Sequence, residues 1–189
     1  MEWRGKDTLV AVLLALSVSD LGTPDLERRA KDAVAAHHLV EARSLYRRIA
    51  EQHPDALGHE IWVGRLSSWL NDYAAANAAF DRVLAADPAN VEALVGKAYV
   101  AMWQDQFGPA DDLLARAVHA APDDAQVQLA LARHYHFQGK DREAAEHVER
   151  ALSLDPGSVD ALDLQRRLAP APERPGFLAR LKRLLTGRS

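Results

Sequence analysis

Four of the nine prolines in this 189-residue chain stand at equal intervals, and this spacing constrains the fold more than any other feature. They are Pro54, Pro88, Pro122 and Pro156. A fixed period of this length, about 34 residues, indicates repeated supersecondary units, each of which buries its apolar face against its neighbours. We therefore expect an array of small repeats in place of a single central core.

The same register holds at other positions. An alanine column consists of Ala42, Ala76, Ala110 and Ala144. A column of small residues consists of Ala30, Gly64, Ala98 and Ala132. A column of bulky apolar residues consists of Tyr46, Phe80, Leu114 and Val148. Because small residues suit places where two helices approach closely, the columns predict two packed helices in each unit, for example at about 91–104 and 108–120.

Composition agrees with an all-α protein. The chain contains 35 alanines, and alanine has the highest helix propensity. The formal net charge of −4 and the pI of about 6.0 argue against a general nucleic-acid binder. The absence of cysteine excludes disulfides, thiolate catalysis and cysteine-based metal sites. No apolar run reaches the roughly 18 residues that a transmembrane helix requires.

The repeat resembles the tetratricopeptide repeat family, of the bacterial type. The family's Ala-x-x-x-Phe element is matched by Ala76 and Phe80, and its Leu-Gly-x-x-Tyr element is best approached by Leu131, Ala132 and Tyr135. The family's first Trp is absent from all four units. The resemblance implies an all-α, right-handed superhelical solenoid of antiparallel helix pairs.

The register also suggests a domain organisation. A hydrophobic N-terminal segment (1–22) precedes the solenoid (23–169), and a proline-rich linker (170–176) joins it to a basic amphipathic C-terminal helix (177–189). Within the solenoid we expect four repeats and a capping helix, at 23–56, 57–90, 91–124, 125–158 and 159–169.

In the family that the chain resembles, the first helix of each repeat builds a concave face that usually holds a partner peptide. Residues spaced by four and by seven or eight share one face of a helix. This spacing selects a candidate groove of Lys31, Ile61, Arg65, Ser68, Trp69, Val95, Tyr99, Met102, Trp103, Leu129, Arg133, His136 and Phe137. An aromatic ladder within it comprises Trp69, Trp103 and Phe137, and a mostly basic ladder comprises Lys31, Arg65, Tyr99 and Arg133. The rings either line the groove or wedge between helices, and both interpretations stay open.

Aromatic and arginine side chains are typical of binding hot spots, so we expect the partner to be another protein or a peptide segment. The cations favour an acidic or carboxylate-bearing segment. One variant of the family clamps a chaperone's C-terminal carboxylate with Lys and Asn at fixed places. The corresponding places here carry Glu27, Lys31, Trp62, Glu92 and Gly96, so that clamp is not present in the same form.

Catalysis has little support in the sequence, and we expect neither cofactor nor metal. The chain has no His-Glu-x-x-His, nucleophile-elbow or phosphate-loop motif. The histidines are expected on the solvated surface, apart from His136 on the groove face. His134 and His136 should point to different sides of one helix, and Glu143 with His147 should form an ordinary helix-surface pair. The sequence thus predicts a non-enzymatic interaction scaffold.

A second, narrower resemblance offers an alternative function. The run at 64–73, followed by Ala76, Val95, Gly96 and Trp103, is similar to periplasmic repeats of bacterial outer-membrane proteins from envelope and exopolysaccharide systems. It implies an envelope-associated protein that assists outer-membrane or exopolysaccharide assembly or export. The groove would then contact a glycan or a secretion-machinery partner.

The two ends of the chain carry their own expectations. Residues 8–18 are apolar all round and are followed by small residues, as in a secretory signal. If residues 1–19 are such a signal, the protein is periplasmic or exported; if they are a helix packed on the first repeat, it is cytoplasmic. A leucine stripe with a basic side at 177–186 suits weak membrane contact, partner docking or folding back onto the solenoid.

Overall fold

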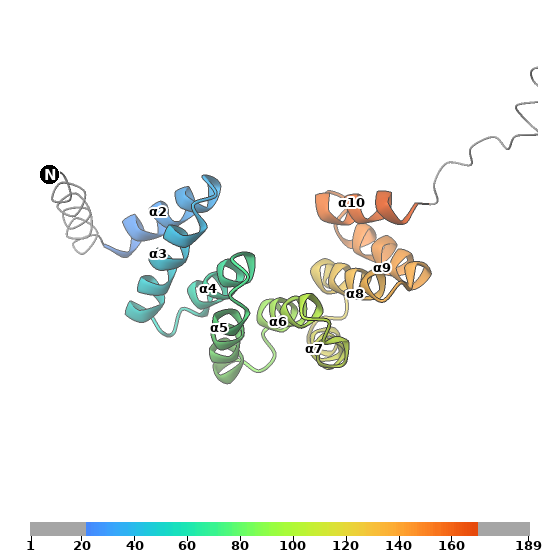
Figure 1. The fold of residues 1–189 in the computed structure, drawn as a ribbon, viewed down its shortest axis with the longest axis horizontal. Helices are drawn as coiled ribbons and strands as arrows, with labels where there is room; N and C mark the ends of the chain where they lie inside the picture. Colours follow the sequence, from blue (N-terminus) through green and yellow to red (C-terminus); the bar gives the residue numbers. More distant parts are fainter. Residues whose placement is uncertain (1–21, 170–189) are drawn as a thin grey trace, which may run out of the picture. The chain divides into compact units, whose positions relative to one another are not determined.

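The computed structural model describes residues 22–169, which fold into helices without any strand (Figure 1). The helices are α2 (Thr23–Ala35), α3 (Leu39–Gln52), α4 (Leu57–Trp69), α5 (Tyr73–Ala86), α6 (Val91–Trp103), α7 (Phe107–Ala120), α8 (Ala125–Phe137), α9 (Asp141–Leu154) and α10 (Val159–Leu168). The expected all-α fold of helix pairs is confirmed. None of these helices is long and apolar enough to cross a bilayer. The expectations for residues 1–21, for the linker and for the C-terminal helix lie outside the described residues.

The helices group into two compact units that are described separately, with α2–α7 in the first and α8–α10 in the second. Within each unit every helix packs against the next along the chain. Turns of three or four residues connect them, and such short connections make neighbouring helices antiparallel. Contacts between α4 and α6, and between α8 and α10, show that first helices of neighbouring repeats also lie side by side.

The turn inside each helix pair contains one residue in the left-handed region. The backbone φ angle there is 58° at His37, 59° at Asn71, 56° at Asp105 and 73° at Gly139, and these four positions recur at the same interval as the prolines. The following residue donates its N–H to a carbonyl five positions back, for example from Lys140 to Tyr135 at 2.9 Å. This hydrogen-bond pattern ends an α-helix and reverses the chain.

The periodic prolines end the second helix of each pair. The residue before each proline, such as Asp87 before Pro88, closes the helix with a bond from its N–H to the carbonyl of Val83 at 2.8 Å. Its backbone is extended because the proline ring disfavours the helical region for the residue before it. Asn90 then caps α6 by accepting a hydrogen bond from the backbone N–H of Ala93. The proline column therefore marks the junction between consecutive repeats.

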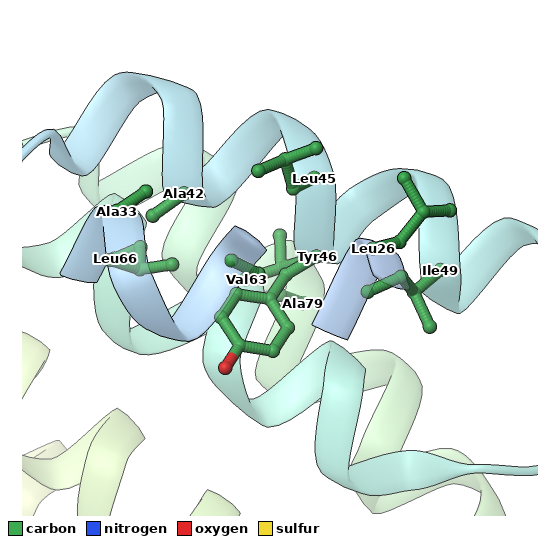
Figure 2. Close-up of a cluster of buried hydrophobic side chains, with 10 residues drawn as sticks. Leu26, Ala33, Ala42, Leu45, Tyr46, Ile49, Val63, Leu66 and Ala79 are labelled. Atoms are coloured by element: carbon green, nitrogen blue, oxygen red, sulfur yellow. The ribbon is translucent and has the colours of Figure 1, made fainter. Parts of the chain in front are cut away.

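Buried aliphatic and aromatic side chains form the contacts between helices. In the first repeat Leu26, Leu45 and Ile49 meet residues of α4 and α5 in one cluster (Figure 2). Figure 2 also shows the Tyr46 ring in this cluster, with its phenolic oxygen directed away from the other drawn side chains. The second unit has its own cluster, in which Leu129 of α8 packs with residues of α9 and α10.

Phe80 of α5 determines how closely two first helices approach. Its side chain is fully buried. A Cβ atom added to Gly64 of α4 would lie 2.6 Å from the Phe80 ring, and one added to Gly96 of α6 would lie 2.5 Å from it. The ring therefore occupies the space that a side chain at either glycine would need, and it separates the two backbones by its own thickness.

We expect the left-handed turn position to favour glycine. Gly139→Ala should lower the free energy of unfolding by about 1 kcal/mol, because a Cβ is strained at this φ angle. His37→Gly should have the opposite sign for the same reason. Urea denaturation followed by circular dichroism measures both changes. Equal stability of Gly139→Ala and the parent chain would contradict this account.

We also expect Gly64→Ala and Gly96→Ala to destabilise the first unit by about 1–3 kcal/mol each, because the new methyl group overlaps the Phe80 ring. Gly58→Ala is the matched control, since nothing lies within 4 Å of its added Cβ and alanine favours a helix. Adding Phe80→Leu to Gly96→Ala should cost less than the sum of the two single changes. Thermal and urea unfolding test this, and a Gly96→Ala protein as stable as Gly58→Ala would refute it.

Candidate partner-binding surface

One stripe of α4 carries two tryptophans and an arginine. Trp62, Arg65 and Trp69 are spaced by three and four residues, so they lie on one side of the helix. The rings of Trp62 and Trp69 meet edge to face with their centres 6.3 Å apart. The guanidinium carbon of Arg65 lies 5.6 Å from the centre of the Trp62 ring, which is a cation–π distance. Trp69 remains 48% exposed although its neighbours hold it in place.

The equivalent stripe of α6 ends in a similar group of rings. Tyr99 stacks on Trp103 with a distance of 6.0 Å between ring centres. Tyr73, the first residue of α5, approaches the same indole to 6.3 Å. Trp103 is 41% exposed. Two tyrosines thus support an indole that still faces solvent.

An ion pair joins the two stripes. The Arg65 guanidinium lies 3.4 Å from the carboxylate of Glu92, in the first turn of α6. We use the term aromatic surface for the group Trp62, Arg65, Trp69, Tyr73, Glu92, Tyr99 and Trp103. Its rings can stack against an extended chain or another flat group, while its arginine is already balanced by a carboxylate.

The second unit repeats part of this arrangement. Phe137 ends α8 at the position that Trp69 and Trp103 occupy in the first unit, and it is 50% exposed. Arg133 pairs with Asp160 of α10 at 2.8 Å, across the same sequence separation as Arg65 and Glu92. His136 pairs with Asp141 at 2.7 Å. Both arginines of the basic ladder therefore contact a carboxylate of the following first helix.

The candidate groove divides into accessible and buried residues. Lys31, Arg65, Trp69, Tyr99, Trp103, Arg133, His136 and Phe137 are exposed or half-buried. Ile61, Ser68, Val95, Met102 and Leu129 are buried within their own units. Ile61, Ser68 and Met102 each precede a tryptophan of the solvent-facing stripe by one position, which turns their side chains by about 100° toward the helix pairs.

Three residues of the aromatic surface, Trp62, Tyr73 and Glu92, were not predicted as groove residues, and one predicted groove residue, Lys31, is paired within its own helix. Trp62 stood out in the sequence only as a departure from a carboxylate clamp, although its spacing of seven from Trp69 places both on one stripe. Tyr73 belongs to a second helix, so the periodicity of the first helices gives no signal for it. Lys31 lies 4.0 Å from Glu27 on its own helix.

A polar cluster lies against the aromatic surface. Tyr46 stacks on Trp62 with 5.3 Å between ring centres, and His59 lies beside the same tyrosine. His59 pairs through Nε2 with Glu27 at 3.0 Å. Burial raises the pKa of Tyr46, and the negative charge of Glu27 adds to that effect. The phenol therefore stays protonated and serves as a flat uncharged support for Trp62.

The expectation of surface histidines is wrong for His134, which is fully buried. His134 stands 34 and 68 residues after Val100 and Leu66, and both of these residues are also buried. The repeat register therefore predicts that His134 is buried. His134 and His136 do point to different sides of α8, as expected. His147 does not form the expected pair with Glu143: its Nδ1 lies 2.9 Å from the side-chain oxygen of Gln128.

Acids and histidines in the described part of the chain do not gather into a metal-binding group. Within residues 22–169 no three His, Cys, Asp or Glu side chains lie close enough together to hold a metal ion. The aromatic surface contains one carboxylate, Glu92, and it is engaged by Arg65. The arrangement therefore offers stacking and hydrogen bonding to a partner.

These packed helix pairs define a helical-repeat protein, and part of the chain matches the model of a known family. The family model described as "Tetratricopeptide repeat" matches residues 70–134. The chain is 30% identical over 158 residues to the Protein CTR9 homolog of Arabidopsis thaliana, covering 81% of this chain and 14% of that protein. The chain therefore spans about one seventh of that relative's length.

Solved structures agree in fold. TTC0263, a thermophilic tetratricopeptide repeat protein of Thermus thermophilus, superposes with a TM-score of 0.70 at 18% identity, covering 78% of this chain and 81% of that one. A tetratricopeptide repeat protein of Parabacteroides merdae gives 0.72 at 20% identity, covering 86% and 64%. The first such domain of Spaghetti (RPAP3), solved with the HSP90 peptide SRMEEVD, gives 0.50 at 21% identity, covering 56% and 83%.

Residues 70–134 thus match tetratricopeptide repeats, and solved tetratricopeptide repeat proteins share the fold over most of the chain. Its fold is that of a protein–protein interaction scaffold, a class that is generally non-catalytic.

His147 provides a pH test of the second unit. Burial lowers the pKa of His147 below its usual 6.5, Arg150 lowers it further, and Glu146 opposes the shift. The unfolded chain therefore takes up this proton more readily than the folded one. We expect the free energy of unfolding to fall as the pH decreases from about 6.5 through the folded-state pKa.

His147→Gln should remove this part of the pH dependence while keeping a donor toward Gln128. Urea unfolding of both proteins between pH 7.5 and 5 measures the difference in slope. Parallel stability profiles of the two proteins over that range would contradict the assignment.

Proposed function

We propose that the protein is a non-enzymatic scaffold that captures a partner segment on the face built by its first helices. Trp69, Tyr99 and Trp103 make the principal contacts in the first unit, and Phe137 provides the corresponding ring in the second. The observation that carries the proposal is the exposure of Trp69 and Trp103, each near one half, at the same position of adjacent repeats. Such large apolar side chains dominate the energetics of protein interfaces.

The support beneath these rings favours binding. Trp69 packs against Trp62, and Trp103 lies between Tyr99 and Tyr73. Rings that are held in this way lose little conformational freedom when a partner covers them, so more of the contact free energy appears as affinity. The neighbouring fold that binds the peptide SRMEEVD supports a peptide as the occupant of such a face.

The arginines have a secondary role in this proposal. Arg65 and Arg133 orient the partner segment, but each already contacts a carboxylate, Glu92 or Asp160. An acidic segment would have to compete with these carboxylates, whereas an uncharged segment leaves both pairs intact. Stacking on the rings is therefore the main source of affinity, and charge adjusts orientation and the rate of encounter.

The test is a Trp69→Ala/Trp103→Ala double variant. Partners captured by the full chain from its source cells should bind this variant at least tenfold more weakly, because each truncation removes a hot-spot ring. Isothermal titration of an identified partner segment measures the loss, and circular dichroism establishes that the variant is folded.

Val159→Ala is the matched control, since Val159 is an exposed apolar residue of α10 outside the aromatic surface. It should bind like the parent chain. Unchanged partner affinity in a folded double variant would overturn the proposal. Parallel titrations with acidic peptides and oligosaccharides, followed by Trp fluorescence, test the envelope alternative, which requires a glycan or secretion-machinery partner on the same rings.

A further inference from the structure

We propose that an open hollow beside the start of α3 receives a tyrosine side chain of the partner segment. The hollow has a volume of about 680 Å³. Leu39, Val40 and Leu70 form its apolar part, and its polar lining includes His38, Glu41 and Ser44. The inference rests on the proposed function for the occupant, a segment of another protein, and adds the residue type that anchors this segment.

The hollow adjoins the end of α4 that carries Trp69. Leu70 follows Trp69 directly and closes this helix, while Leu39 and Val40 begin α3. Val40 is 64% exposed although its side chain is apolar. Exposed apolar side chains that gather in a hollow are typical of surfaces that bind a partner. A segment held on Trp69 therefore passes next to the hollow.

The equivalent position of the second repeat carries a ring of the chain itself. The turns before α3 and α5 have the same backbone geometry, with φ angles of 58° at His37 and 59° at Asn71. Two residues after these positions stand Leu39 and Tyr73, which begin the two helices. The Tyr73 hydroxyl donates to the side chain of Asn71 at 3.1 Å, and its ring approaches Trp103 to 6.3 Å. Because leucine is smaller than tyrosine, the first repeat leaves open a space that the second repeat fills.

A partner's ring in the hollow can contact Trp69 as the Tyr73 ring contacts Trp103. Trp69 occupies the position of Trp103 one repeat earlier and is 48% exposed. Aromatic pairs with ring centres about 4.5–7 Å apart attract each other beyond the contribution of their buried area. The second repeat thus provides, within this chain, an example of the ring that suits the first.

The polar lining favours tyrosine among the residues that could enter. The Glu41 carboxylate lies 3.9 Å from the Arg29 guanidinium and 3.8 Å from Nδ1 of His38. Both distances exceed that of a hydrogen bond, so the carboxylate oxygens can still accept one. A phenol O–H that donates to a carboxylate forms a short, charge-assisted hydrogen bond. A tyrosine therefore matches both the apolar and the polar part of the hollow, whereas leucine and phenylalanine lack the donor.

The first experiment uses the full chain and three small probes. N-acetyl-tyrosinamide should shift the methyl resonances of Leu39, Val40 and Leu70 in two-dimensional NMR spectra, with saturation in the millimolar range that suits so small a ligand. N-acetyl-phenylalaninamide and N-acetyl-leucinamide should each bind at least threefold more weakly. The inference is overturned if either of them binds as tightly as the tyrosine probe, or if methyl groups throughout the chain shift equally.

The second experiment fills the hollow from within. Leu39→Tyr gives the first repeat the residue of the second, and it should weaken the tyrosine probe and an external partner at least tenfold. Val40→Glu should weaken both as well, because it places a charge in the apolar part at a position exposed enough to leave the fold intact. Leu154→Tyr is the matched control, since Leu154 is a 40% exposed leucine of α9 in the second unit. It should bind both ligands like the parent chain.

The outcomes separate this inference from the proposed function. Circular dichroism establishes that each variant is folded, and unchanged probe binding by folded Leu39→Tyr and Val40→Glu chains would overturn the inference. A partner that requires Trp69 and Trp103 yet binds Leu39→Tyr as tightly as the parent would overturn the inference alone and leave the proposed function standing. Probe binding at the hollow, together with a partner affinity that survives Trp69→Ala/Trp103→Ala, would overturn the proposed function instead.

Discussion

The position of the Phe80 ring between two glycines sets the geometry on which the first unit depends. Gly64 and Gly96 contribute no side chain, so the α4 and α6 backbones both approach the ring until it fills the space between them. Because Trp69 and Trp103 end these same two helices, their separation follows from that contact. A buried packing constraint between the two helices thus fixes the spacing of the two exposed indoles at their ends. The candidate site is therefore as rigid as the interface between repeats.

The interface between the first and second repeats is packed differently from the interface between the second and third. Tyr46 occupies the column of Phe80, but the residue that faces it one repeat later is Trp62, where Phe80 meets Gly96. The two rings stack nearly in parallel, with 9° between their planes. This exchange has a functional result, because Trp62 then supports Trp69 from below and holds the Arg65 guanidinium over its face. The replacement of glycine by tryptophan at position 62 thus changes the packing between repeats and also supplies a ring to the aromatic surface.

The fold could be predicted from the sequence because the same 34-residue period governs the helix ends, the close helix contacts and the buried side chains. Prolines, small residues and bulky residues in one register define helix pairs without any knowledge of their contacts. The site was harder, because a face chosen by a spacing of seven or eight covers two adjacent positions, and Ser68 with Trp69 shows that one of them is buried. His134 could have been placed from the buried column of Leu66 and Val100. The Tyr73 contact could not, since it joins two different helices across a repeat boundary.

Charge was the least predictable property of the surface, and it changes how recognition is understood. Arginines that recur along one face suggest a cationic groove when they are counted alone. Arg65 and Arg133 each meet a carboxylate of the following first helix, and only the folded register brings these partners together. The exposed pairs contribute little to stability, but they cancel the field that would attract an anionic segment. The exposed aromatic rings remain on this face. They attract apolar groups without a strong directional preference, so they would select a partner by its shape. In the function that we propose, recognition therefore depends on how well a segment fits the distance between two indoles, and the contact of Phe80 with both helices sets that distance.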